Sequence, residues 1–317
     1  MKFISILLGA VFCLILILSL RNDVTFRVVG YVHSFNRVPD LSRIQFKKIT
    51  HLNIAFVNPD SSGNLKLPAG FDSIITTAHN NNVKVLASIG GGSHNPYYSK
   101  LLSDSGRSVF IERLVKLSID HKLDGIDIDL ENDAIDSNYA PFVISLSLKL
   151  RSNNKLMTAA FATWNANLIS DSALEKFDFI NIMSYDETGP WRPERAGQHS
   201  PFSKAENDIR YWRETRHLPK EKINLGLPFY AYCFNTKYGA SMSFESIVKT
   251  FPGSQSKDSI VPEGGGIIYY NGLPTIRKKT ELAFANTGGV MIWQLLQDSP
   301  GEHSLLSAID ETHRSEK

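Results

Sequence analysis

Eight short runs of apolar and β-branched residues alternate with longer amphipathic segments along this 317-residue chain. Continuous apolar runs of this kind are typical of parallel strands that are buried on both faces. The intervening segments have helical periodicity, as in residues 107–121, where Phe110, Leu114 and Leu117 recur on one face. The pattern predicts an α/β fold, with strands at residues 27–32, 49–57, 83–89, 123–131, 156–162, 177–185, 222–229 and 288–293.

Two architectures satisfy this alternation, a closed barrel and an open doubly wound sheet. An open sheet is expected to carry a phosphate-binding loop after an early strand, but the glycine-rich residues 89–93 match neither GxGxxG nor GxxxxGK[ST]. We therefore predict a single (β/α)8 TIM barrel over residues 24–312, close to the ~250 residues typical of that fold. Phe229 and Gly288 are too close in sequence for a large α+β insertion domain, and residues 252–266 read as a long loop.

The chain begins with an apolar segment, residues 3–20, that follows Lys2. As a helix this segment would be about 27 Å long, slightly less than the ~30 Å hydrocarbon core of a membrane. It exceeds the usual 7–15 apolar residues of a cleaved leader and lacks a small-x-small cleavage site. We predict a signal peptide or membrane anchor in residues 1–22, with the anchor favoured, and a charged tail at residues 313–317.

Composition narrows the possible ligands. The formal net charge of +2 gives no electrostatic reason to expect a nucleic-acid partner. The two cysteines are Cys13, in the apolar leader, and Cys233, so the folded domain cannot form an internal disulfide. Neither CxxC nor HExxH occurs, and we expect no metal and no organic cofactor.

Residues 124–131, with the sequence DGIDIDLE, are the most informative stretch for chemistry. Side chains alternate across a strand, so Asp127, Asp129 and Glu131 share one face, with backbones spaced about 6.6 Å apart. Three acids on the inward face of an apolar strand cannot all ionise, and at least one pKa must rise, as a general acid requires. A calcium loop and a solvated acidic edge strand fit the pattern less well. Asp124 has the opposite parity and is expected to brace the start of the strand.

This strand resembles the DGxDxDxE hallmark of the family 18 glycoside hydrolases, the chitinases and endo-β-N-acetylglucosaminidases. Three further segments are similar to elements of that family. Residues 88–91 (SIGG) resemble its SxGG element, residues 183–186 (MSYD) its MxYD element, and residues 288–293 (GGVMIW) its closing strand with a tryptophan. All four occur in the family's order, each on a predicted strand.

The resemblance implies a role for each acidic residue. Glu131 would protonate the glycosidic oxygen, and the substrate's own 2-acetamido oxygen would attack C1, an exception to the two-carboxylate retaining scheme. Asp129 would orient the acetamido N–H, and Asp127 would share a proton with Asp129. Tyr185 would bind the acetamido group, while Asp186 would contact sugar hydroxyls.

The resemblance also implies a set of aromatic and apolar residues that bind sugar. Trp293 would form the floor of the site, because an indole ring offers an apolar surface to the C–H face of a pyranose. Further sugar-contacting positions are expected at Tyr31, Phe56, Met183 and Trp191. Trp191, like Trp164 and Tyr230, is a weaker candidate for a flanking subsite, for which loop packing is an equal alternative.

Three functions remain open at this point. An endo-acting chitinase is favoured; an endo-β-N-acetylglucosaminidase acting on N-glycan cores shares the same catalytic residues, and a non-catalytic lectin-like member would typically lack Glu131. Leu130, Asn132 and Asp133 depart from the Trp before the acid and the Tyr-Pro after it in many chitinases, and the last two are expected to shape the rim. We expect a monomer outside the cytoplasm, with a partner that contains N-acetylglucosamine and with membrane contact only through the N-terminal segment.

Overall fold

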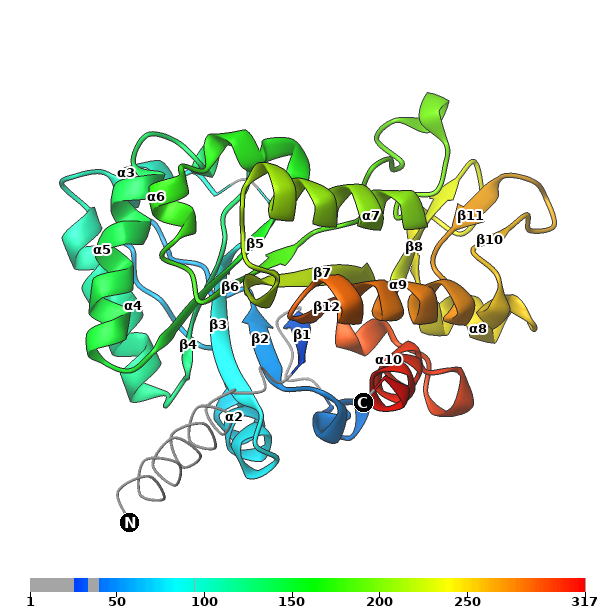
Figure 1. Cartoon of the computed structure of the whole chain (residues 1–317), viewed down its shortest axis with the longest axis horizontal. Coiled ribbons are helices and arrows are strands. Elements are labelled where there is room, and N and C mark those ends of the chain that lie inside the picture. Colours follow the sequence, from blue (N-terminus) through cyan, green and yellow to red (C-terminus); the bar gives the residue numbers. More distant parts are fainter. Residues whose placement is uncertain (1–25, 34–39, 94, 317) are drawn as a thin grey trace, which may run out of the picture.

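The centre of the molecule is a closed barrel of eight parallel strands, in a computed structural model that describes residues 26–33, 40–93 and 95–316 (Figure 1). The strands follow each other around the barrel in chain order, and β12 closes it against β1. They are β1 (Arg27–His33), β2 (His51–Ala55), β3 (Lys84–Gly90), β4 (Gly125–Asp129), β5 (Leu156–Phe161), β6 (Phe179–Ile182), β7 (Ile223–Pro228) and β12 (Gly289–Trp293). The predicted TIM barrel is confirmed. Most predicted strands ran up to two residues before the observed start or up to three past the observed end, because apolar residues continue into the adjoining turns, whereas those for β1 and β3 ended one residue early.

Helices cover the outside of the barrel, as Figure 1 shows. They are α2 (Phe71–Asn80), α3 (Tyr98–Leu102), α4 (Arg107–Asp120), α5 (Tyr139–Ser152), α6 (Asp171–Leu174), α7 (Phe202–Arg210), α9 (Leu273–Asn286) and α10 (Leu305–Ser315). The outward faces of the strands are apolar: Ile126 and Ile128 of β4 are fully buried in the same core as Phe110 and Phe142, whose rings stack 5.9 Å apart between α4 and α5. Burial of each such side chain stabilises the fold by about 1.5–3 kcal/mol.

The register of the strands brings polar side chains to one level inside the barrel. Asp127 pairs with Ser88 of β3 on one side and with Thr158 of β5 on the other. All three side chains are completely buried. Asp124, just before β4, accepts the Val85 backbone N–H (2.7 Å) and so braces the start of the strand.

The connection between β7 and α9 departs from the expectation of no α+β insertion. It forms a small four-stranded antiparallel sheet in the order β10-β11-β8-β9, together with helix α8 (Phe244–Thr250). The strands are β8 (Tyr230–Phe234), β9 (Ser241–Ser243), β10 (Ser259–Ile260) and β11 (Ile267–Tyr269). Most of them span only two or three residues, so the Gly-, Ser- and Pro-rich sequence around them reads as a loop.

The sequence predicted a targeting segment at one end of the chain and a charged tail at the other. The predicted signal peptide or anchor, residues 1–22, lies outside the described residues. Within the ranges that the structure describes, no helix has the length and apolarity needed to cross a membrane. At the other end the chain does not become a free tail at residue 313, because α10 continues to Ser315 and His313 stacks on Phe26 with ring centroids 4.9 Å apart.

Gly90 sets how closely the end of β3 approaches the end of β4. Its φ is +109°, and a Cβ atom there would lie 2.1 Å from the Asp129 carbonyl oxygen. The next residue, Gly91, donates its N–H to that same oxygen at 2.7 Å. A glycine is therefore required for the backbone contact that holds Asp129 in place.

We expect Gly90→Ala to lower the free energy of unfolding by about 3–5 kcal/mol, because it adds a backbone clash to an unfavourable φ. Gly239→Ala is the matched control, since Gly239 has a φ of +81° but nothing within 4 Å of a Cβ atom. Its cost is expected to be only about 1–2 kcal/mol. Urea denaturation of both variants measures the difference, and equal losses would show that the Gly90–Asp129 contact has no special importance.

Candidate active site

A cavity of about 310 Å³ opens at the carboxyl ends of the barrel strands. This end of a TIM barrel carries the catalytic residues in characterised enzymes. All the residues predicted for the site line the cavity, except Asp127, Trp191 and the weaker candidate Trp164. The lining residues are Tyr31, Phe56, Gly92, Asp129, Glu131, Ala160, Met183, Tyr185, Asp186, Tyr230, Tyr232, Ser241, Met291, Trp293 and Gln297.

A second cavity of about 370 Å³ adjoins the first along the same end of the barrel. Its lining comes from the end of β3, the described part of the β3–α3 loop, the first residues of α3 and residues 130–134 after β4. Gly92 and Glu131 belong to both linings. The Glu131 carboxyl therefore stands between two adjoining spaces that together form one cleft.

Asp127 lies beneath the floor of the first cavity and is enclosed by hydroxyl groups. Thr158 donates to its Oδ1 at 2.5 Å, and Tyr31 and Ser88 each donate to its Oδ2 at 2.7 Å. Burial raises the pKa of Asp127, and these three donors oppose that rise by stabilising the charged form. With its lone pairs engaged, this carboxyl cannot reach a ligand in the cleft.

Asp129 has very different surroundings, although it is only two residues further along the strand. It is 4% exposed, and its Oδ1 atom has no hydrogen-bond partner among the described residues. Burial raises its pKa well above the ordinary value, and the charges of Glu131 and Asp127 raise it further. Asp129 thus lines the cavity with a carboxyl group whose charged form is disfavoured by its surroundings, and its buried Oδ1 atom is left without a partner.

Glu131 is partly exposed at the mouth of the cleft. Burial raises its pKa to about 7, with a further contribution from the negative charge of Asp186. A carboxyl group with this pKa holds a proton at neutral pH and can release it in a reaction, as general acid catalysis requires.

Asp186 and two tyrosines form the wall opposite β4. Asp186 follows β6 with a φ of +59°, and its Oδ1 accepts a short hydrogen bond from the Tyr230 hydroxyl of the small sheet. Tyr185 directs its hydroxyl into the cavity, where the only partner recorded for it among the described residues is the Met291 sulfur at 3.8 Å. Sulfur is a weak acceptor, so this hydroxyl remains available to a ligand.

Aromatic rings form the floor. The Trp293 indole stacks on Phe56 with centroids 5.6 Å apart and an interplanar angle of 24°, and it contacts Tyr31 at 5.6 Å. The peptide bonds Ala55–Phe56 and Trp293–Gln294 are both cis. One face of this platform borders the cavity. Such a surface suits the C–H face of a sugar ring.

Two predicted aromatic positions lie outside the cavity. Trp191 is 57% exposed and contacts the edge of Tyr232 at 5.2 Å, so it stands on the rim. Trp164 is 65% exposed and does not line the cavity either. Sequence reasoning missed the lining residues Tyr232, Ser241 and Gln297. The alternation of Tyr230 and Tyr232 along β8 was the only signal for the first of them.

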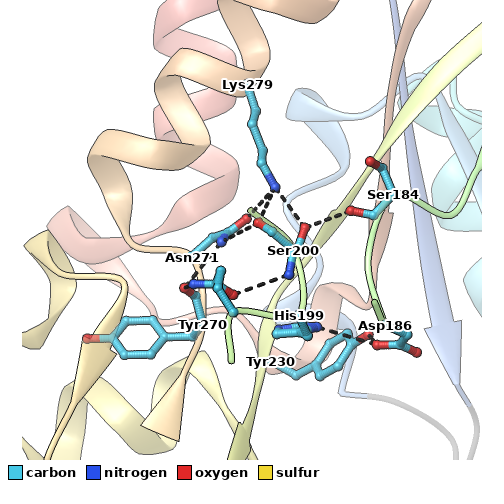
Figure 2. Close-up of polar contacts among 9 residues, drawn as sticks. Ser184, Asp186, His199, Ser200, Tyr230, Tyr270, Asn271 and Lys279 are labelled. Atoms are coloured by element: carbon cyan, nitrogen blue, oxygen red, sulfur yellow. Dashed lines mark hydrogen bonds and ion pairs between the residues drawn. The ribbon is translucent and has the colours of Figure 1, made fainter. Parts of the chain in front are cut away.

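A buried lysine supports the wall from behind, as Figure 2 shows. Lys279 of α9 donates at 2.7 Å to the carbonyl and hydroxyl oxygens of Ser200 and to Asn271 Oδ1. The neighbouring residue, His199, is fully buried, and its Nδ1 lies 3.4 Å from Asp186 Oδ1. Its ring also packs against Tyr230 at 5.0 Å. Burial lowers the pKa of Lys279 to about 7. Through its hydrogen bonds to Ser200, the lysine holds the β6–α7 loop, which also carries Asp186, against helix α9.

Within the described ranges, no cluster of three or more His, Cys, Asp or Glu side chains is arranged to hold a metal ion. Asp127 is partnered by hydroxyl groups, and Asp129 and Glu131 follow it at intervals of two residues along the chain. What the site offers chemically is acid–base chemistry in a cleft with an aromatic floor.

Comparison with known proteins identifies the family. Residues 27–298 match the family described as glycosyl hydrolases family 18. A family 18 chitinase of Flavobacterium johnsoniae is 40% identical with a TM-score of 0.85, over 92% of this chain and 95% of that chain. A chitinase of Bacteroides thetaiotaomicron is 29% identical with a TM-score of 0.79, over 92% and 97% of the two chains. This chain therefore belongs to glycosyl hydrolase family 18.

A sequence relative of a different description is a "chitinase-like effector" of Moniliophthora roreri. It is 30% identical over 229 residues, which are 62% of this chain and 56% of the relative. This chain thus matches only about half the length of that protein.

We expect Asp186→Asn to lower the pKa of Glu131 by about one pH unit, because it removes a nearby negative charge while the burial of Glu131 persists. Titration of ¹³C-labelled glutamate carboxyls by NMR measures this, with Glu131→Gln assigning the signal. Tyr230→Phe is the control, since it removes a hydrogen bond to Asp186 but leaves the charge. An unchanged Glu131 midpoint in Asp186→Asn would contradict the electrostatic link.

Proposed function

We propose that this protein is an endo-acting glycoside hydrolase that cleaves β-1,4 linkages between N-acetylglucosamine units, in chitin or its oligosaccharides. The observation that carries the proposal is Glu131, a carboxyl group with a pKa of about 7 that lies between two adjoining cavities. Membership of family 18 and likeness to two solved chitinases support the substrate class. A polymeric substrate of this kind favours a location outside the cytoplasm.

In the proposed first step Glu131 donates its proton to the glycosidic oxygen as the C1–O bond breaks. The nucleophile is the acetamido oxygen of the sugar, which attacks C1 and forms an oxazolinium ion. Asp127 is not a candidate for this role, because its oxygens are enclosed by three hydroxyl donors. The unpartnered Oδ1 of Asp129 accepts a hydrogen bond from the acetamido N–H and stabilises the positive charge of the oxazolinium ion.

The Tyr185 hydroxyl holds the acetamido oxygen in line with C1, since its only recorded partner in the described part of the chain is a weak one. In the second step the Glu131 carboxylate takes a proton from water, the water oxygen bonds to C1, and the oxazolinium ring opens. Two displacements at C1 give overall retention of configuration. Throughout, Trp293 supports the sugar ring from below and Asp186 contacts its hydroxyl groups.

We expect Glu131→Gln to reduce the turnover rate by about 10²–10⁴-fold, because it keeps the shape of the side chain but removes the transferable proton. Asp129→Asn is expected to have a comparable cost, since the amide cannot carry the charge that stabilises the oxazolinium ion. Binding of chitotetraose, measured by calorimetry, should persist in both variants. Turnover of Glu131→Gln near the wild-type rate would refute the assignment of the acid.

Cleavage within the polymer follows from the position of Glu131 between the two cavities. Sugars on the non-reducing side of the cut occupy the aromatic-floored cavity, and the leaving sugars lie over the β3–α3 loop and residues 130–134. The small sheet adds Tyr232 and Ser241 to one wall.

Product masses from chitohexaose and longer oligomers test this mode of action. We expect mixed products of two to four sugars from the start, because the chain can bind in several registers. Disaccharide as the dominant product in the first minutes would indicate cutting from the chain end. A high-mannose glycoprotein in parallel tests for an endo-β-N-acetylglucosaminidase, and binding of chitohexaose without any hydrolysis would identify a non-catalytic lectin-like protein.

A further inference from the structure

A continuous series of hydrogen bonds crosses the barrel interior from its amino-terminal end to Asp127. Arg27 Nε donates to Asn224 Oδ1 at 3.0 Å, and Asn224 Nδ2 donates to Asn181 Oδ1 at 2.9 Å. Asn181 Nδ2 then donates to the Tyr31 hydroxyl oxygen at 3.3 Å, and Tyr31 donates to Asp127 Oδ2 at 2.7 Å. The series connects a guanidinium group at the bottom of the barrel with the carboxylates of β4.

Strand register places the members of this series within reach of one another. Asn181 and Asn224 are paired residues on the neighbouring strands β6 and β7. Arg27 and Asn224 lie on either side of β12, where both pair with Gly289. A Cβ atom on Gly289 would lie 2.7 Å from both Arg27 Cβ and Asn224 Oδ1. The glycine therefore leaves the space through which the guanidinium reaches the amide.

The direction of every hydrogen bond follows from the first member. A guanidinium group has only donors, so Asn224 must turn its carbonyl oxygen toward Arg27. Its NH₂ group then faces Asn181, which must present an oxygen there and its own NH₂ to the Tyr31 oxygen. The single hydrogen of the Tyr31 hydroxyl is left for Asp127. An isolated asparagine pair could take either orientation, and the arginine selects one.

We infer that Arg27 is a positioning residue that orients the Tyr31 hydroxyl so that it donates to Asp127. This hydrogen bond keeps Asp127 ionised, so that the proton shared among the three neighbouring acids resides on Asp129 or Glu131. The inference rests on the proposed function only for its effect on turnover. Of the residues in the series, only Tyr31 lines a cavity, whereas Arg27, Asn224 and Asn181 line neither.

Other groups around the two ends of the series affect the same equilibrium. Those facing Asp127 are Asp129 on its own strand, Asn53 of β2, Ser88 of β3, Thr158 of β5 and Tyr139 of α5. Arg27 lies over the Phe179 ring at 4.5 Å, near His51, and contacts the Glu221 backbone. Each hydrogen-bond donor stabilises the charged form of the buried Asp127 carboxyl, so loss of any one donor raises the pKa of Asp127 further.

The test follows the Asp127 carboxyl directly, by NMR titration of the protein labelled with ¹³C at aspartate carboxyls, with Asp127→Asn used for assignment. In Arg27→Met we expect the midpoint of Asp127 to rise by about one pH unit, since a hydrogen bond to a charged group is lost. Arg27→Lys keeps a group that can only donate and should restore most of the wild-type midpoint.

A double-mutant cycle separates the hydrogen-bond series from the charge of Arg27 acting at a distance. In a Tyr31→Phe background, Arg27→Met is expected to cause no further rise in the titration midpoint of Asp127. Equal rises in both backgrounds, or none in either, would overturn the inference. Lys222→Met removes another cation near that end of the barrel, one that donates to the backbone oxygens of Phe177 and Glu175, and should leave the Asp127 midpoint unchanged.

If Arg27→Met does not fold, Asn224→Asp provides the second variant. The aspartate keeps an acceptor for Arg27 but has no N–H to donate to Asn181. The Asn181 amide therefore flips and presents its oxygen to Tyr31, whose hydroxyl then donates to Asn181 instead of to Asp127. We expect the same rise, again abolished in the Tyr31→Phe background; its persistence there would overturn the inference.

Turnover offers a second readout of the same series. The acidic limb of the pH–rate profile should move to higher pH in Arg27→Met, because Asp127 must lose its proton before the sugar can react. An unmoved limb alongside a raised Asp127 midpoint would overturn the catalytic consequence. Absence of any hydrolysis by the wild-type protein would refute the proposed function, while the carboxyl titration would still decide the inference.

Discussion

Three acidic side chains on the inward face of one short strand are the constraint on which the rest of this structure depends. Their burial penalises ionisation, and each carboxyl meets that penalty differently. Asp127 has three hydroxyl donors, Asp129 keeps an unused oxygen, and Glu131 lies at the mouth of the cleft near Asp186. Three groups of similar chemistry thus have different surroundings, although burial raises the pKa of each of them.

Much of the barrel interior is organised around the deepest of these acids. Ser88 and Thr158 flank Asp127 because they are paired with it on the adjacent strands, and Tyr31 reaches it from across the barrel. The polar series that continues through Asn181 down to Arg27 explains why this interior is not filled by aliphatic side chains alone. Buried polar groups of this kind are stable only when nearly all of them have partners.

The wall of the cleft has a different origin from its floor. Trp293 and Phe56 come from barrel strands or their immediate ends, whereas Tyr230 and Tyr232 belong to the antiparallel sheet inserted after β7. Lys279 joins the barrel helix α9 to the loop that carries His199, so that the position of Asp186 depends on contacts well outside the cleft. The residues that surround a sugar are therefore held by several independent elements of the fold.

The sequence alone determined the barrel, the inward face of β4 and the order of the family motifs, because strand alternation and apolar periodicity are local properties. It did not reveal the small sheet, whose strands of two to five residues are too short to show a clear alternation and pair with segments distant in sequence. Tyr232 and Ser241 were missed because they belong to that sheet, and Gln297 was missed because it lies in a short turn after β12. Strand register, which joins residues as distant as Arg27 and Asn224, arises only when the barrel closes, and it decided which polar atoms meet.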